Sequence, residues 1–152
     1  MKINKNLFCM MYFFMIVLIV LVAVNSILHF YPFKTIDMIQ PFKIVNDSRV
    51  ITKGDIVFIQ MNYLKHIDNP ATTTKYIYGK SKIDDTVVIS LGSTITATKQ
   101  GKHTLISGTV LPDSIPCGEY KMVYLVVYEL FGGFRKISKT FESESFQVVK
   151  CD

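Results

Sequence analysis

The pattern of hydrophobic and polar residues changes sharply near residue 25. Leu7 to Val24 is a run of eighteen residues with no charge, amide, glycine or proline. After Phe33 the apolar residues occur in short stretches, in which they alternate with polar ones. An unbroken apolar run predicts a helix in an apolar environment, whereas short alternating stretches predict β-strands. We therefore expect one apolar helix followed by a domain of strands.

The apolar run is long enough to cross a membrane. At 1.5 Å per residue, eighteen helical residues approach the ~30 Å of hydrocarbon in a bilayer, and Ile27 to Tyr31 can extend the span into the interface. We interpret residues 7–31 as a transmembrane anchor, in the manner of an uncleaved signal-anchor, with the lipid bilayer as its partner. Pro32 is expected to end the helix.

Two other interpretations of the run remain. A cleaved signal peptide is one alternative, because Val24-Asn25-Ser26 offers a small residue at a cleavage position, although the run is longer than the usual core of 7–15 residues. A buried helix of a soluble domain is the other. It is disfavoured because the run has no polar face at any helical period.

The charges that flank the run predict its orientation. Lys2 and Lys5 precede it with no acidic residue, whereas Lys34 after it is offset by Asp37. By the positive-inside rule, residues 1–6 lie in the cytoplasm. We expect residues 32–41 to be a linker and residues 42–152 to form an extracytoplasmic domain of a single-pass membrane protein.

The domain after the linker has the pattern of an all-β protein. In residues 55–64, Val57, Ile59, Met61 and Tyr63 form a continuously apolar set on one side, so this set is expected to face the core. The stretches expected to be strands are 42–45, 55–64, 72–78, 86–91, 94–98, 102–111, 120–130 and 134–149. About seven or eight short strands without helical periodicity predict an antiparallel sandwich of two sheets.

The last two stretches predict a β-hairpin. Gly132-Gly133 separates them, and this pair accepts the positive φ angles of a two-residue turn. The corresponding register places Glu129 opposite Lys136 and Tyr124 opposite Phe141, both favourable cross-strand pairs. The alternation breaks at residues 142–145, which predicts a bulge.

The hairpin register also brings two of the three cysteines together. It places Cys117 near Val148, and Cys151 follows three residues later. Because disulfides persist outside the cytoplasm, we predict a Cys117–Cys151 disulfide. Cys9 lies in the apolar run and is expected to remain a separate thiol.

Residues 111–120 support a closer comparison. A proline-containing turn, then Gly118 and Tyr120, then an alternating strand resemble the entry to the penultimate strand of immunoglobulin-like and fibronectin type III-like domains. The resemblance implies an immunoglobulin-like sandwich, in which Tyr120 forms a corner hydrogen bond to upstream backbone. The chain lacks tryptophan and has no cysteine in residues 55–64 for an inter-sheet disulfide. Its layout also resembles small single-pass proteins of unknown function from bacteriophages and bacteria.

Charge and chemical motifs narrow the functional classes. The net charge is +5, but the basic residues are dispersed, so nucleic-acid binding is not predicted. His29, His66 and His103 are not spaced as metal ligands, and no nucleophile elbow, phosphate loop or H-E-x-x-H motif occurs. We therefore expect no enzyme activity, no cofactor and no metal site.

The remaining prediction is a binding or structural role. The polar loop after residue 64 offers Lys65, His66, Asp68 and Asn69 as candidate contact residues, because loops on a rigid scaffold often bind partners. We predict a membrane-tethered module that binds a protein or has a structural role. The alternative is an envelope accessory factor that binds a soluble ligand or a metal ion.

Overall fold

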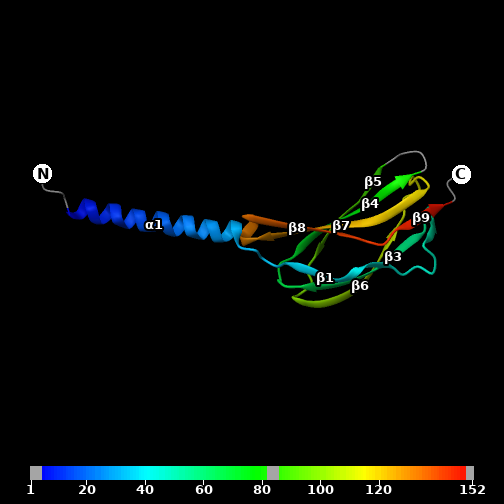
Figure 1. Ribbon diagram of the computed structural model, residues 1–152, viewed down its shortest axis with the longest axis horizontal. Coiled ribbons are helices and arrows are strands. Elements are labelled where there is room, and N and C mark those ends of the chain that lie inside the picture. The colour runs from blue at the N-terminus through cyan, green and yellow to red at the C-terminus, as the bar shows by residue number, and fades with distance from the viewer. Residues whose placement is uncertain (1–4, 82–85, 150–152) are drawn as a thin grey trace. The chain divides into compact units, whose positions relative to one another are not determined.

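A computed structural model of the chain describes residues 5–81 and 86–149, with side chains from residue 8 onward (Figure 1). The chain divides into two compact units, residues 1–33 and residues 34–152. Within the described residues, the first unit contains one helix and the second contains nine strands and a short 3-10 turn.

The helix α1 spans Lys5–Phe30. Its segment Phe8–Phe30 has 23 residues, is strongly apolar and is not buried against the rest of the structure. The side chains of Ser26 and His29 form hydrogen bonds with the carbonyls of Val22 (2.8 Å) and Asn25 (3.0 Å), so these polar groups are satisfied within the helix. The helix ends just before Pro32, where its end was predicted. Its length and composition are sufficient for it to span a membrane and anchor the second unit.

The second unit is a β-sandwich of two sheets, which confirms the predicted fold class. The smaller sheet has the strand order β1-β3-β6, with β1 at Ile36–Ile44, β3 at Ile56–Lys65 and β6 at Gly101–Val110. The larger sheet has the order β2-β9-β7-β4-β5, and β8 also pairs with β7. Its strands are β2 (Val50–Thr52), β4 (Ala71–Ser81), β5 (Val87–Thr96), β7 (Gly118–Leu130), β8 (Arg135–Glu142) and β9 (Phe146–Val149).

The core lies between the facing sides of the two sheets. The predicted inward set on β3, which begins at Val57 and ends at Tyr63, is buried. From the larger sheet, β7 contributes alternate residues, among them Tyr120, Tyr124 and Tyr128. Large aromatic side chains from one long strand therefore fill much of the interior.

The predicted linker is shorter than expected, because β1 begins at Ile36 and not after residue 41. β1 pairs with β3 from Ile36 opposite Lys65 to Ile44 opposite Ile59, with two register irregularities along the way. Those irregularities obscure the alternation that would have identified the strand. Pro41 is tolerated because it lies in the irregularity between Gln40 and Lys43, where it has no registered partner in β3 and its missing N–H breaks no ladder.

The stretches 86–91 and 94–98 were predicted as two strands, but β5 runs continuously from Val87 to Thr96. Gly92 has φ +92° and lies with Leu91 opposite the single residue Lys75, so it forms a bulge and not a break. The three-residue strand β2 was not predicted. It pairs in parallel with β9, so the sandwich is not purely antiparallel.

The predicted hairpin register is confirmed, with Glu129 opposite Lys136 and Tyr124 opposite Phe141. The two-residue turn is wrong: the last pair is Leu130–Arg135, and the four residues between them include Phe131, Gly132 and Gly133 with φ of 54°, 68° and 94°. The chain therefore reverses direction through a four-residue connection, in which Phe131 adopts positive φ as well as the two glycines.

The stretch 134–149 forms two strands, β8 and β9, separated at the predicted bulge. Ser143 replaces regular pairing there: its backbone N–H donates to the Met122 carbonyl, and its hydroxyl accepts from the Met122 N–H, each at 2.9 Å. Beyond Ser143, Gly118 of β7 pairs with Val148 of β9. This pairing is shifted by one residue relative to the register between β7 and β8.

Candidate functional site

The predicted contact loop is held by hydrogen bonds to other parts of the sandwich. The Asp68 carboxylate accepts a hydrogen bond from the Gln100 backbone N–H at 2.5 Å, and the Asn69 amide donates to the Glu129 carbonyl at 3.4 Å. These contacts connect the loop after β3 to the loop before β6 and to the end of β7. The two side chains thus have a structural role that does not require a partner.

Lys65 and His66 are also engaged within the domain. The His66 ring lies 2.8 Å from the Asp37 carboxylate, and this hydrogen bond lowers the pKa of Asp37. Lys65 is 1% exposed and its ammonium donates to the Thr98 carbonyl. Lys65 therefore points into the sandwich. From the sequence it was instead predicted to lie in an exposed loop.

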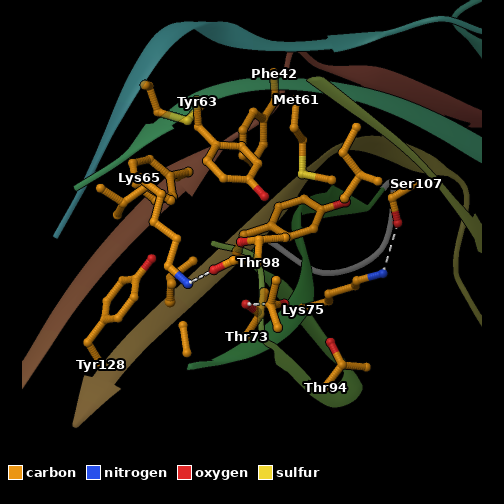
Figure 2. A pocket seen from close by; sticks show the side chains of 18 residues that line it. Phe42, Met61, Tyr63, Lys65, Thr73, Lys75, Thr94, Thr98, Ser107 and Tyr128 are labelled. Atoms are coloured by element: carbon orange, nitrogen blue, oxygen red, sulfur yellow. Dashed lines mark hydrogen bonds between the residues drawn. The ribbon is translucent and has the colours of Figure 1, made fainter. Parts of the chain in front are cut away.

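A cavity lies between the two sheets at the inner end of Lys65 (Figure 2). Its volume is about 130 Å³, and its walls come from the facing sides of β1, β3, β4 and β7. On one side it is closed by Phe42, whose ring packs against those of Tyr124 and Phe141. On the other side lie β5 and β6, the outer strands of different sheets, which are not paired with each other. Thr94 and Thr96 of β5 and Leu105 and Ser107 of β6 also line the cavity.

Lys65 supplies one positive charge at this cavity. Its ammonium lies 5.7 Å from the centre of the Tyr128 ring, within the range of a cation–π interaction. Burial lowers the pKa of Lys65, and the nearby Asp68 carboxylate opposes that shift. The carbonyl of Thr98 and the Tyr128 ring thus compensate part of the lost hydration.

Lys75 supplies a second positive charge, from β4 in the other sheet. Its ammonium donates to the Ser107 hydroxyl at 3.0 Å and lies 5.9 Å from the Tyr124 ring centre. Figure 2 shows the two lysines reaching different walls, Lys65 toward Thr98 and Lys75 toward Ser107. The bulge at Gly92 lies opposite Lys75 in the β4–β5 ladder, so the backbone is irregular beside this charge.

Two buried hydroxyls on the cavity wall lack a hydrogen-bond partner among the described residues. They are Tyr124 Oη and Thr98 Oγ1. Burial raises the pKa of Tyr124 to about 12, and the neighbouring hydroxyls of Ser107 and Thr109 oppose that shift. Burial also raises the pKa of Tyr128 to about 12. Both phenols therefore remain protonated at neutral pH.

Sequence reasoning missed Lys75, Tyr124 and Thr98 as possible site residues. A signal was present for Lys75: on β4 it lies on the same face as Thr73 and Ile77, whose side chains face the interior. A lysine at a core-facing position of a strand is unusual, because a charge is costly to bury. That position could have been identified as a candidate.

A second candidate surface is the outer face of the smaller sheet. Ile56, Phe58, Ile106 and Val110 are exposed there, with Ile106 at 59% and Val110 at 60%. The register places Ile56 opposite Val110 and Phe58 opposite Gly108, so these side chains share one face. We call these four residues the β6 patch. In the part of the chain that the structure describes, β6 pairs only with β3, so its other edge is open.

The residues predicted to be structural lie as follows. Tyr120 is buried and its hydroxyl donates to the Pro116 carbonyl at 2.9 Å, the contact expected of a tyrosine corner. Cys9 is a free, exposed thiol. Cys117 is not a free thiol, and its proposed partner Cys151 lies outside the described residues, so their disulfide stays a prediction.

No group of three potential metal ligands is found in the described residues.

Comparisons with known proteins identify no family. No family model matches the chain, and no curated protein matches it. Similar solved structures include the CARDB domain of PF1109 from Pyrococcus furiosus, in complex with di-metal ions, at 14% identity and TM-score 0.40. The match covers 77% of this chain and 91% of that one.

Two further structures are similar at the same level. A Niemann-Pick type C2 protein from the Japanese carpenter ant has 10% identity and TM-score 0.42, covering 78% of this chain and 100% of that one. The DNA glycosylase AlkC from Pseudomonas fluorescens has 17% identity and TM-score 0.39, covering 72% of this chain. The match spans only 30% of the glycosylase. Similarity this weak supports no inference about ligand or activity.

Proposed function

We propose that this protein is a membrane-tethered, extracytoplasmic binding module and not an enzyme. In this proposal α1 stays in the bilayer as a signal-anchor, residues 1–6 remain in the cytoplasm, and an immunoglobulin-like sandwich lies outside. The apolar length of α1 and the basic residues that precede it support this topology. The partner is a protein, and nucleic acid is not a ligand.

The single observation that carries the interaction role is the β6 patch beside an open strand edge. An exposed apolar edge strand is a template for pairing with another chain, and soluble proteins usually protect such edges with charges or prolines. Within β6, the charged side chain is that of Lys102, near the start, while Ile106 and Val110 occupy the second half of the strand. We propose that an extended segment of another protein adds to this edge as a strand.

Backbone pairing and side-chain contact would act together at this edge. The unpaired N–H and C=O groups of β6 would supply hydrogen bonds, and the apolar side chains of the β6 patch would supply buried area. Gly108 leaves room for the Phe58 ring, since a Cβ there would lie 3.0 Å from Phe58 Cε1. The ring therefore lies against β6 and extends the apolar surface toward the edge.

Site-specific photo-crosslinking in native membranes tests this proposal. A photoreactive residue at Val110 should give a protein adduct of defined mass, whereas one at Lys121, on the outer face of the other sheet, should not. The change Ile106→Glu should abolish the Val110 adduct without lowering the urea midpoint. Absence of an adduct, or equal adducts from both positions, contradicts the proposal. An adduct with the mass of two copies would identify self-association in place of a different partner.

A second candidate function is supported by the cavity between the sheets. The alternative predicted from the sequence was an accessory factor that binds a soluble ligand. A cavity with two lysines on its walls supports the ligand part of that alternative.

A further inference from the structure

The cavity has the size and lining for a small apolar group. Its volume of about 130 Å³ is close to that of an apolar protein cavity of ~150 Å³ that holds benzene. Met38, Met61, Leu105 and Val126 contribute apolar walls. A long acyl chain or a larger ring system would exceed this space, so the body of a ligand must be short.

The two lysines give the cavity positive charge that the domain balances only in part, through the Asp68 carboxylate near Lys65. The ion pairs formed by the described residues are Arg49–Glu144, His66–Asp37, Lys121–Glu142 and Lys136–Glu129. None of them includes Lys65 or Lys75. Each ammonium has three N–H donors. Lys65 donates one hydrogen bond, to the Thr98 carbonyl, and Lys75 donates one, to the Ser107 hydroxyl. Lys75 is a partly buried cation without an ion-pair partner among the described residues, so an anion that enters beside it would stabilise it.

The unpartnered hydroxyls indicate where polar atoms of a ligand would lie. Tyr124 is 2% exposed, lines the cavity and has no described partner for its hydroxyl. Unsatisfied buried polar groups are uncommon in folded proteins, and a missing bound molecule is one recognised cause. The Tyr124 ring is also the one that lies under the Lys75 ammonium. A phenol donor and an ammonium donor thus occur together at one side of the cavity.

We propose that this cavity binds a small carboxylate with a short apolar body, of the size of hexanoate or phenylacetate. The carboxylate pairs with Lys75 and accepts a hydrogen bond from Tyr124 Oη, while the apolar body lies against Met38 and Met61. Lys65 contributes positive charge, but its ammonium is already held by the Thr98 carbonyl and the Tyr128 ring. This proposal is independent of the protein partner proposed for β6.

Methyl NMR on the full chain in phosphatidylcholine nanodiscs tests the proposal. With ¹³C-methyl methionine, hexanoate should shift the Met38 and Met61 signals in a saturable manner. Met10, Met11 and Met15 lie in α1, so their signals report partitioning of hexanoate into the lipid and should not saturate with the other two. Hexanamide, which has the same body without the charge, should bind at least about tenfold more weakly.

Variants separate charge recognition from general effects. Lys75→Met should weaken hexanoate binding at least about tenfold, Lys75→Arg should retain most of it, and Lys102→Met, at an exposed position on β6, should leave it unchanged. If Lys75→Met lowers the urea midpoint, the ratio between hexanoate and hexanamide on the unmodified protein still decides the question. The proposal is overturned if Met38 and Met61 show no saturable shift, or if hexanoate and hexanamide bind equally.

Discussion

The hydroxyl of Tyr120 shows how one side chain fixes the path of a turn. It donates to the Pro116 carbonyl, four residues earlier, and so ties the turn that precedes β7 to the first inward-facing residue of that strand. The same side chain fills the core, since it is 1% exposed. Its ring and its hydroxyl therefore contribute separately to stability, and the two can be tested separately.

Tyr120→Phe keeps the ring and removes the hydrogen bond. We expect the free energy of unfolding to fall by about 0.5–1.5 kcal/mol with the fold preserved, as is typical for the loss of one side-chain hydrogen bond. Urea denaturation of the two proteins measures this change. Tyr78→Phe is the matched control, because Tyr78 is exposed, and it should change stability by less than about 0.5 kcal/mol. An unchanged urea midpoint for Tyr120→Phe would remove the tyrosine corner as a stabilising feature.

The C-terminal strands depend on a register that spans two separate ladders. β8 pairs with the second half of β7, and after Ser143 the chain returns as β9 to pair with its beginning. Gly118 opposite Val148 is the pair nearest to Cys117 among the described residues. A covalent bond there would join the start of β7 to the end of the chain.

We expect Cys117 and Cys151 to form a disulfide in protein isolated from its native compartment. The bond would close a loop of roughly 35 residues, and its loss in Cys151→Ser should lower stability by up to about 3–4 kcal/mol. Peptide mapping without reduction identifies the linkage directly. Cys9→Ser is the control and should change neither the map nor the stability of the sandwich. Free thiols at both positions would contradict the predicted pairing.

The whole molecule combines an apolar helix with a domain whose core is complete without it. The helix exposes its apolar side chains on all sides, whereas the sandwich buries an apolar core and exposes other apolar side chains, those of the β6 patch among them. An exposed apolar helix of this length is stable only in an apolar surrounding such as a bilayer. This contrast is the physical basis for treating α1 as an anchor.

We expect the mature protein to retain residues 1–26 and to remain with membranes through an alkaline carbonate wash. Introducing charge at the middle of the helix, as in Leu18→Lys with Leu21→Lys, should release it, because each lysine there costs about 2.5–3.5 kcal/mol. Immunoblotting of the washed fractions and amino-terminal sequencing measure both outcomes. A mature protein that begins at Ile27 would instead establish cleavage of a signal peptide.

The sequence by itself determined those features that depend on neighbouring residues along the chain. The length of the apolar run predicted α1, and the alternation in residues 55–64 predicted which side of β3 is buried. The charges and aromatic residues around Gly132-Gly133 predicted the register of β7 and β8. Each of these follows from local geometry: 1.5 Å per helical residue, side chains that alternate along a strand, and pairs set by one turn.

Only the tertiary structure decided which surfaces meet. Lys65 and Lys75 lie on strands of different sheets, so their presence at one cavity depends on how the sheets pack. The open edge of β6 likewise depends on the strand order β1-β3-β6. Strand periodicity specifies the side on which a residue lies but not the element that faces it, because contacts between sheets join residues that are distant in sequence.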